Sequence, residues 1–243
     1  MDFTLSKYSA LLDALKAYGF ESLVLRHDVD LLPGNSLRTA RLEAEKGMLG
    51  IYYFRAVPES WDESVIREIA ALGHEIGYHY ESLTTCDRDV DKAYEDFCHI
   101  LEALRKLVSV KSICMHGSPR SPYDSKDIWK KYDYKALGIE NEPYLDTDFS
   151  KVFYLTDTGR RWDGYKVSVR DKIPQYQDEW TARGLTFHTT DDVIEGIRKG
   201  VIPKDLMVTV HPQRWNPFGL KWAKELVLQN AKNIVKRLII KKK

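Results

Sequence analysis

The sequence predicts an α/β fold with a largely parallel sheet, on the strength of three observations. The 243 residues show no repeat, low-complexity tract or linker rich in proline, glycine and serine, so we expect a single domain over residues 1–243. Short β-rich runs alternate with helical patterns, which is typical of a parallel sheet, either open and doubly wound or closed into a barrel. Asp or His follows several of these runs, and in both forms functional residues gather at the C-terminal strand ends.

The elements can be assigned in chain order from apolar spacing and capping residues. Residues 1–20, MDFTLSKYSALLDALKAYGF, have the spacing of an amphipathic helix. Asn35 or Ser36 can cap a second helix that stops near Gly47, and Asp87 can cap another helix over the following residues. Seven strand-like runs are predicted, at Ser22–Arg26, Gly50–Arg55, Glu75–Tyr78, Lys111–Met115, Val152–Thr156, Leu185–His188 and Leu206–Val210.

Composition excludes some classes of partner. The 37 basic and 36 acidic residues nearly cancel, which argues against a nucleic-acid-binding protein. The basic end VKRLIIKKK suits a solvated helix end or a weak contact with anionic lipid. No secretory signal pattern and no membrane-spanning apolar window is visible, and three cysteines without a CxxC pair are typical of a reducing compartment. We therefore expect a cytoplasmic protein.

The run LVLRHDVDLL ends in two closely spaced carboxylates. Side chains alternate along a strand, so Asp28 and Asp30 share one face, roughly 6 to 7 Å apart. At the end of a buried strand such a pair is costly unless a cation, a proton or hydrogen-bond donors compensate. A solvated strand end, with Asp30 capping a turn, is the simpler alternative.

Four other strand-like runs also lead to acidic or imidazole side chains. His79 and Glu81 share a face after the third run, and His116 follows the fourth. Asp157 and His211 each come directly after a later run. If the sheet is parallel, these ends meet at one rim and supply ligands suited to zinc or another divalent first-row metal.

Four segments carry a resemblance to a known family: RHDVD at Arg26–Asp30, GHEIGYHYE at Gly73–Glu81, MHGSP at Met115–Pro119 and TVHP at Thr209–Pro212. With these segments the sequence resembles the polysaccharide deacetylase superfamily, metal-dependent amide hydrolases with the NodB homology domain (carbohydrate esterase family 4-like). The resemblance implies a distorted (β/α) barrel of about seven strands. It also implies that Asp28 is the catalytic base, that Asp30 and His79 are metal ligands, and that His211 is the general acid.

The sequence departs from the family pattern in two places. Leu83 stands where members usually carry a second ligand histidine, and a zinc site normally takes three protein ligands plus a water. Glu81 and His116 are both candidates for the missing ligand, with a slight preference for the imidazole of His116. MHGSP replaces the usual Arg-x-Pro element, which leaves Arg26 as a candidate to brace the base Asp28.

The predicted function is removal of an N-acetyl or other N-acyl group from a sugar. Asp157 can orient His211 and keep it charged, and Trp162, Trp215 and Tyr80 can stack on sugar rings. A nucleotide-linked or lipid-linked precursor of a surface polysaccharide, such as capsule or lipopolysaccharide, is the expected substrate. The alternatives are a degenerate barrel that binds metal or sugar without hydrolysis, a glycosyltransferase that uses D-x-D as a metal clamp, and a hydrolase of a formyl group or a non-sugar amide.

Overall fold

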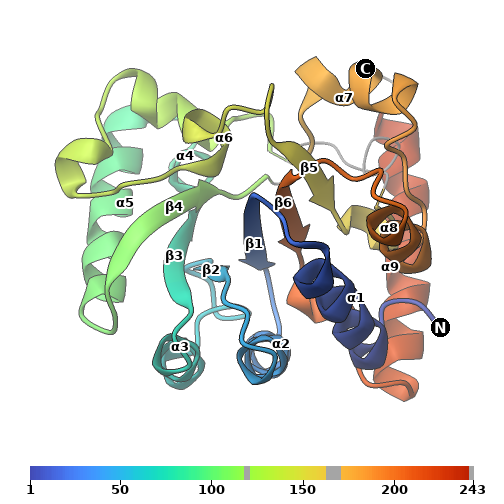
Figure 1. Cartoon of the computed structure of the whole chain (residues 1–243). Helices are drawn as coiled ribbons and strands as arrows, with labels where there is room; N and C mark the ends of the chain where they lie inside the picture. The colour runs from blue at the N-terminus through green and yellow to red at the C-terminus, as the bar shows by residue number, and fades with distance from the viewer. Residues whose placement is uncertain (118–120, 163–170, 241–243) are drawn as a thin grey trace.

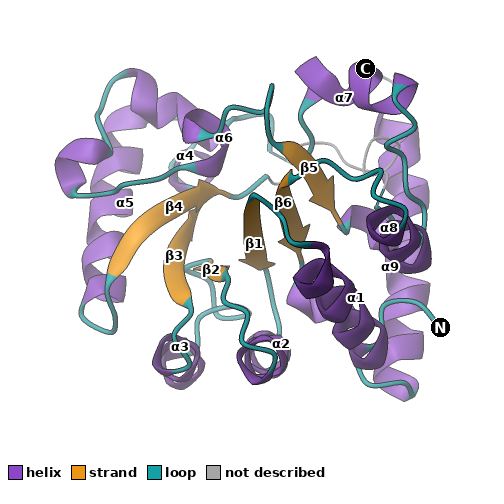
Figure 2. Ribbon diagram, in the orientation of Figure 1, coloured by secondary structure: helices purple, strands orange, loops and turns teal. Residues whose placement is uncertain are grey.

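The computed structural model describes residues 1–117, 121–162 and 171–240, with the side chains of these residues except 235–240. Six parallel strands form one sheet in the order β4-β3-β2-β1-β6-β5 (Figures 1 and 2). Their bounds are β1 Ser22–Val29, β2 Ile51–Phe54, β3 Glu75–Tyr80, β4 Val110–Met115, β5 Phe153–Thr156 and β6 Asp205–Val210. The prediction of an α/β fold with a parallel sheet is confirmed.

The strand order is that of a barrel with one side left open. Strands β1 to β4 are successive neighbours, and β5 and β6 continue the same cycle on the other side of β1. In the described residues the sheet does not close between β4 and β5, so the predicted distorted (β/α) barrel is an open one, and the prediction of about seven strands is wrong because the sheet has six. At this opening the chain after β4 makes only an isolated bridge, between Ser112 and Asn141. A single bridge adds too little backbone pairing to continue the sheet around to β5.

The predicted strand at Leu185–His188 is also wrong. This segment connects helix α7 (Pro174–Ala182) to helix α8 (Thr190–Arg198) and runs without strand pairing. The Leu185 N–H donates to the Trp180 carbonyl at 2.9 Å. Leu185 and Phe187 are buried in the core. Phe187 lies against Gly196, where a Cβ atom would come within 2.7 Å of the ring. The apolar pattern here reflects the anchoring of a loop rather than a strand.

Nine α-helical segments lie in the described residues: α1 Leu5–Tyr18, α2 Pro33–Glu45, α3 Glu63–Ala71, α4 Ser82–Thr85, α5 Val90–Arg105, α6 Pro143–Asp146, α7 Pro174–Ala182, α8 Thr190–Arg198 and α9 Leu220–Ile240. The predicted N-terminal helix is confirmed as α1. Helix α5 is capped by Asp89 instead of Asp87, which itself has a positive φ of 47°.

Helix α2 differs from the prediction at its start but not at its end. It begins at Pro33, and neither Asn35 nor Ser36 caps it. The Asn35 amide instead donates to Asn216 Oδ1 at 3.1 Å, which ties α2 to the loop after β6. Gly47 follows the helix with a φ of +66°, the left-handed conformation that ends many helices.

The helix-covered outer face of the sheet is mainly apolar, whereas the inner face carries many polar groups. Parallel crossovers are right-handed, so strands that follow one another in steady order place their connecting helices on the same side. Figure 1 shows α1, α2, α3 and α5 outside the curved sheet. Apolar side chains such as Tyr52, Phe54 and Ile76 pack in the core clusters. The alternate side chains carry the polar groups of the inner face.

No helix in the described part of the chain is long and apolar enough to cross a membrane.

Candidate active site

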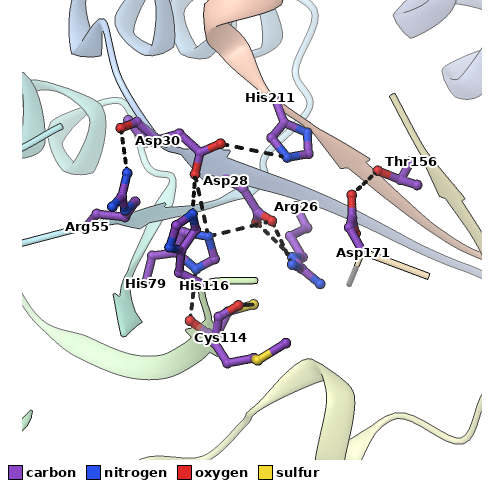
Figure 3. Close-up of polar contacts among 12 residues, drawn as sticks. Arg26, Asp28, Asp30, Arg55, His79, Cys114, His116, Thr156, Asp171 and His211 are labelled. Atoms are coloured by element: carbon purple, nitrogen blue, oxygen red, sulfur yellow. Dashed lines mark hydrogen bonds and ion pairs between the residues drawn. The ribbon is translucent and has the colours of Figure 1, made fainter. Parts of the chain in front are cut away.

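The polar residues that follow the strands meet at one rim of the sheet, as Figure 3 shows. His79 Nε2 lies 3.8 Å from Asp28 Oδ2 and 3.8 Å from Asp30 Oδ1. His116 Nε2 lies 3.6 Å from the same Asp30 Oδ1, and His211 Nε2 lies 4.0 Å from Asp30 Oδ2. Residues far apart in sequence thus converge on one carboxylate, because their strands run parallel and end together.

Asp28 is held by Arg26 from two positions earlier on β1. The Arg26 guanidinium donates from Nε to Oδ1 at 2.9 Å and from Nη2 to Oδ2 at 2.7 Å. Burial acts to raise the pKa of Asp28, but the charges of Arg26 and then His79 outweigh it and hold this pKa below its usual value. Asp28 is therefore an ionised carboxylate in a fixed orientation.

Asp30 lies just beyond the end of β1 and is only partly paired. Its Oδ2 accepts from Gln213 Nε2 at 3.1 Å. Its Oδ1 is buried, yet no donor in the described residues hydrogen-bonds to it. Burial acts to raise the pKa of Asp30, but His116, His211 and His79 together lower it. An ionised oxygen without a donor is costly unless a cation completes its surroundings.

His79 presents an unprotonated nitrogen to Asp30. Its Nδ1 lies 2.9 Å from the Cys114 carbonyl oxygen, which can only accept, so we assign the ring proton to Nδ1. Burial lowers the pKa of His79 to about 4, and the carboxylate of Asp28 only partly offsets this effect. The imidazole is neutral at pH 7, and the lone pair of Nε2 faces the rim.

His116 has a similar arrangement, with Glu81 behind it. Its Nδ1 lies 2.8 Å from Glu81 Oε2, which leaves Nε2 to face Asp30 Oδ1. Arg55 binds the other oxygen of Glu81 from Nε at 3.0 Å and Nη2 at 2.7 Å. Burial acts to raise the pKa of Glu81, but His116 and then Arg55 lower it to about 2. Glu81 thus orients His116 instead of facing Asp30 itself.

Leu83, where the resemblance would place a ligand histidine, points away from the rim. It lies in α4 and packs with Ala93 and Ile128. Gly77, in contrast, has a clear local reason. The ring of Tyr53 on the neighbouring strand fills the space beside it, and a Cβ at Gly77 would lie 2.3 Å from Tyr53 Cδ1. Ser118 and Pro119 of the MHGSP segment lie outside the described residues.

The donor set at the rim fits a metal ion. Two nitrogen atoms, Nε2 of His79 and Nε2 of His116, lie within 4 Å of Asp30 Oδ1, to which no donor in the described residues hydrogen-bonds. Two imidazoles and one carboxylate, with a hydrogen bond behind each imidazole, form a common zinc-binding arrangement. A divalent ion would turn this repulsive arrangement into a favourable one.

A second grouping of possible ligands lies deeper in the sheet. Donor atoms of Asp28, His79 and Cys114 all fall within 4.8 Å of one another. Burial raises the pKa of the Cys114 thiol well above its usual value, which opposes the thiolate that metals bind. Arg26 already occupies both oxygens of Asp28. The grouping around Asp30 is therefore the better cation site.

His211 is positioned by a buried network on the opposite side of Asp30. Its Nδ1 lies 2.7 Å from Asp157 Oδ1. Asp157 is fully buried and also accepts from Arg214 Nη1 at 2.6 Å and Trp215 Nε1 at 2.8 Å. Burial and Arg214 act to lower the pKa of His211, but Asp157 outweighs them and raises it. His211 can consequently hold a proton near neutral pH.

The structure corrects the predicted sugar-stacking residues Trp215 and Tyr80. Both are 0 % exposed, so neither offers a ring face to a ligand. Trp215 packs beside Phe3 and Tyr8, with ring centroids 4.8 and 4.9 Å away. The Tyr80 hydroxyl accepts from Trp129 Nε1 at 2.8 Å on the outer face of β3.

Trp162, the third predicted stacking residue, is 3 % exposed, and its Nε1 donates to Thr190 Oγ1 at 3.0 Å. It lines a small cavity beside β5 together with Asp171 and Gln177. This arrangement gives Trp162 little open surface on which a sugar could stack. Its assignment as a substrate-binding residue stays a prediction.

Several residues of the site are absent from the sequence-based prediction. Asp171 accepts from Thr156 Oγ1 at 2.5 Å and from Tyr144 at 3.1 Å, and these contacts add to the polar groups beside Arg26. It follows β5 by fifteen residues and has no sequence signal of its own. Arg55 directly follows β2, so the rule that applied to the other strand ends would have found it. Gln213, in contrast, reaches Asp30 only through the turn after His211.

Comparisons with known proteins give limited information. No protein-family model and no curated protein matches the chain. Among solved structures it is similar to one of PdaA from Bacillus subtilis, described as a family 4 carbohydrate esterase, with 14% identity, a TM-score of 0.39, and coverage of 96% of this chain and 90% of that chain. At this identity and TM-score, the likeness assigns no activity to this chain.

Proposed function

We propose that this protein is a metal-dependent hydrolase that removes an N-acyl group, the N-acetyl group in the first instance, from a sugar. The observation that carries the proposal is the convergence of Asp30 Oδ1 with the Nε2 atoms of His79 and His116. In this proposal these three residues hold a divalent ion, zinc by the nature of the donors. Binding of metal or sugar alone would need neither the ionised Asp28 nor the proton-holding His211 that flank this position.

The proposed ligand set uses His116 in place of the residue at position 83. Glu81 supports His116 from behind, as carboxylates commonly do for metal-binding histidines. Glu81 is less suited to be the ligand, because Arg55 and His116 already neutralise it. Arg55 therefore acts on the proposed metal site through Glu81 and His116.

The proposed reaction divides proton transfer between two sides of the rim. An ion at this site would polarise the amide carbonyl and make the attacking water more acidic. Asp28 takes one proton from this water as the new C–O bond forms. The C–N bond then breaks, and His211 supplies the proton that the amine nitrogen needs. The acyl group leaves as acetic acid, which loses its proton to solvent to give acetate, and the other product is the free amino sugar. Asp28 releases the proton that it took from water and His211 regains one, so both residues return to their starting states and atoms and charge balance.

The proposal extends to the location of the enzyme and to its substrate. A cytoplasmic enzyme of this type would act on a nucleotide-linked or lipid-linked precursor of a surface polysaccharide. A formamide or another non-sugar amide fits the same catalytic residues, since these residues contact only the scissile group. Assays on a panel of N-acetylated sugar nucleotides, with formamides and small N-acyl amines alongside, separate the two.

The test begins with metal content, measured by elemental analysis of the purified protein. We expect about one zinc or similar ion per chain, lost in Asp30→Ala, His79→Ala and His116→Ala. Cys114→Ala and the exposed-histidine control His99→Ala should keep it. Glu81→Gln should weaken metal affinity by about 10- to 100-fold without abolishing it. Loss of metal in Cys114→Ala with retention in His116→Ala would overturn the ligand set, and absence of metal after supplementation would overturn the proposal.

A further inference from the structure

The C-terminal helix α9 has polar side chains among its buried residues and apolar side chains among its exposed ones. On the buried side Gln229 donates to Asn233 at 2.7 Å, and Asn233 donates to the Gly159 carbonyl at 2.8 Å. Glu225 pairs with Arg160 on the same side. These contacts attach α9 to the turn after β5 through hydrogen bonds and an ion pair.

The opposite side of α9 is apolar and exposed. The exposed fractions are 90 % for Leu220, 68 % for Val227, 51 % for Leu228 and 61 % for Ile234, and Phe218 just before the helix is 67 % exposed. Leu220, Val227 and Ile234 recur every seven residues, so they form one stripe along the helix. Five of the ten large apolar side chains exposed in the described residues fall in this short segment.

Several large apolar side chains exposed along one side of a helix are typical of an interaction surface. Figure 1 shows α9 along the outside of the molecule, and the exposed fractions show that these side chains are accessible. We call Phe218, Leu220, Val227, Leu228 and Ile234 the outer face of α9.

Charge identifies the partner of this outer face. Residues 219–243 contain eight lysines or arginines and a single acid, Glu225, whereas residues 1–218 contain 29 basic and 35 acidic residues. Because Glu225 is paired with Arg160 on the buried side, its charge does not offset the lysines. Lys221, Lys224 and Lys232 are exposed beside the apolar stripe. Residues 241–243, all lysine, lie outside the described residues but belong to the same basic segment.

We propose that the outer face of α9 rests on an anionic lipid bilayer. An apolar stripe flanked by lysines is the pattern of helices that lie in the plane of a membrane surface, where apolar side chains enter the interface and lysines face anionic headgroups. A two-fold contact between two copies of this face would instead set one basic segment against another. The inference rests on α9 alone and is independent of the proposed hydrolase.

The test is sedimentation of the full chain with vesicles of phosphatidylcholine, either alone or mixed with phosphatidylglycerol. We expect binding to the mixed vesicles only, weakening as salt is added because exposed charges are screened. The double substitution Val227→Glu and Ile234→Glu should reduce this binding by about tenfold or more, since it places charge in the apolar stripe. Val201→Glu, at an apolar residue that is 54 % exposed elsewhere on the surface, is the matched control.

Three outcomes would overturn the proposal. The first is the absence of binding to the mixed vesicles. The second is an equal loss of binding in the Val201→Glu control, which would indicate general electrostatic adsorption. The third is a dimer in size-exclusion chromatography that the double variant dissociates, in the absence of vesicle binding, which would assign the outer face of α9 to a second copy of the chain. Circular dichroism of each variant establishes that the fold is retained.

Discussion

Arg26 binds both carboxylate oxygens of Asp28, its neighbour on the same face of β1. The pair is almost completely buried, with side-chain exposures of 1 % and 5 %. The Arg26 guanidinium also lies 4.7 Å from the ring centroid of Tyr144, which fixes it from the other side. Arg26, a residue of the same strand, thus keeps the proposed base Asp28 both ionised and fixed in orientation.

We expect Asp28→Asn to retain the metal and to lose turnover by about 10²- to 10⁴-fold, the usual contribution of a general base. The amide has nearly the same shape as the carboxylate but does not take a proton from water. Elemental analysis and the rate of acetate release measure the two effects separately. Asp13→Asn, at an exposed acid, should change neither quantity. Hydrolysis at the parent rate by Asp28→Asn would remove this residue from the mechanism.

His211 should determine the alkaline limit of activity. It donates its proton only when charged, and its pKa is raised above 6.5 because Asp157 outweighs burial and Arg214. The rate should therefore decrease as the pH rises through this elevated pKa. Asp157→Asn removes the negative charge that raises the pKa of His211, while Arg214 continues to lower this pKa. The decrease of the rate at alkaline pH should therefore begin at a lower pH in this variant. We also expect kcat to fall by about 10²-fold.

The pH profile distinguishes this role of Asp157 from a purely structural one. A variant that merely folds less well would have a lower rate at every pH, but its rate would begin to decrease at the same alkaline pH as that of the parent protein. Asp157→Asn also leaves Arg214 without its charge partner, so urea unfolding of the variant gives the structural part of the loss. A lower rate whose decrease begins at the same alkaline pH would mean that Asp157 does not tune His211.

Sequence reasoning predicted the meeting of the strand ends because that meeting depends only on local rules. Alternation along β1 places Asp28 and Asp30 on one face, and parallel strands carry His79, His116 and His211 to the same rim. The assignments of individual roles to these residues remain predictions. Their proximity follows from the parallel strand order and the alternation of side chains.

The placement of other side chains depends on tertiary contacts that local rules do not contain. Glu81 has the same parity as His79, but β3 ends at Tyr80 and the backbone of Glu81 turns there, with a φ of −141° and a ψ of 20°. The alternation of side chains along a strand therefore no longer predicts the direction of the Glu81 side chain. Trp215 lies close to a motif in sequence, yet its burial depends on Phe3 and Tyr8 from the other end of the chain.

A second buried polar cluster, on the helix-covered side of the sheet, provides a test of stability separate from catalysis. Glu43 of α2 is fully buried and lies 2.7 Å from His27 Nε2. The Tyr52 hydroxyl donates to it at 2.9 Å, and the Tyr8 hydroxyl also donates to it. Burial acts to raise the pKa of Glu43, but His27 and the Tyr8 hydrogen bond lower it.

We expect Glu43→Gln to reduce the free energy of unfolding by about 3 kcal/mol at pH 7, the usual cost of removing one partner from a buried ionic network. Urea unfolding measures this change. Glu45→Gln, at an exposed position of the same helix, should be nearly neutral.

The contribution of Glu43 to stability should also depend on pH. Since the pKa of Glu43 is lower in the folded chain, its stabilisation is present above the ordinary glutamate pKa of about 4.3 and is lost as the pH falls through the folded value. The difference between parent and Glu43→Gln should therefore shrink below about pH 4. A difference that stays constant down to the acid transition would mean that packing, rather than the charge of Glu43, stabilises this cluster.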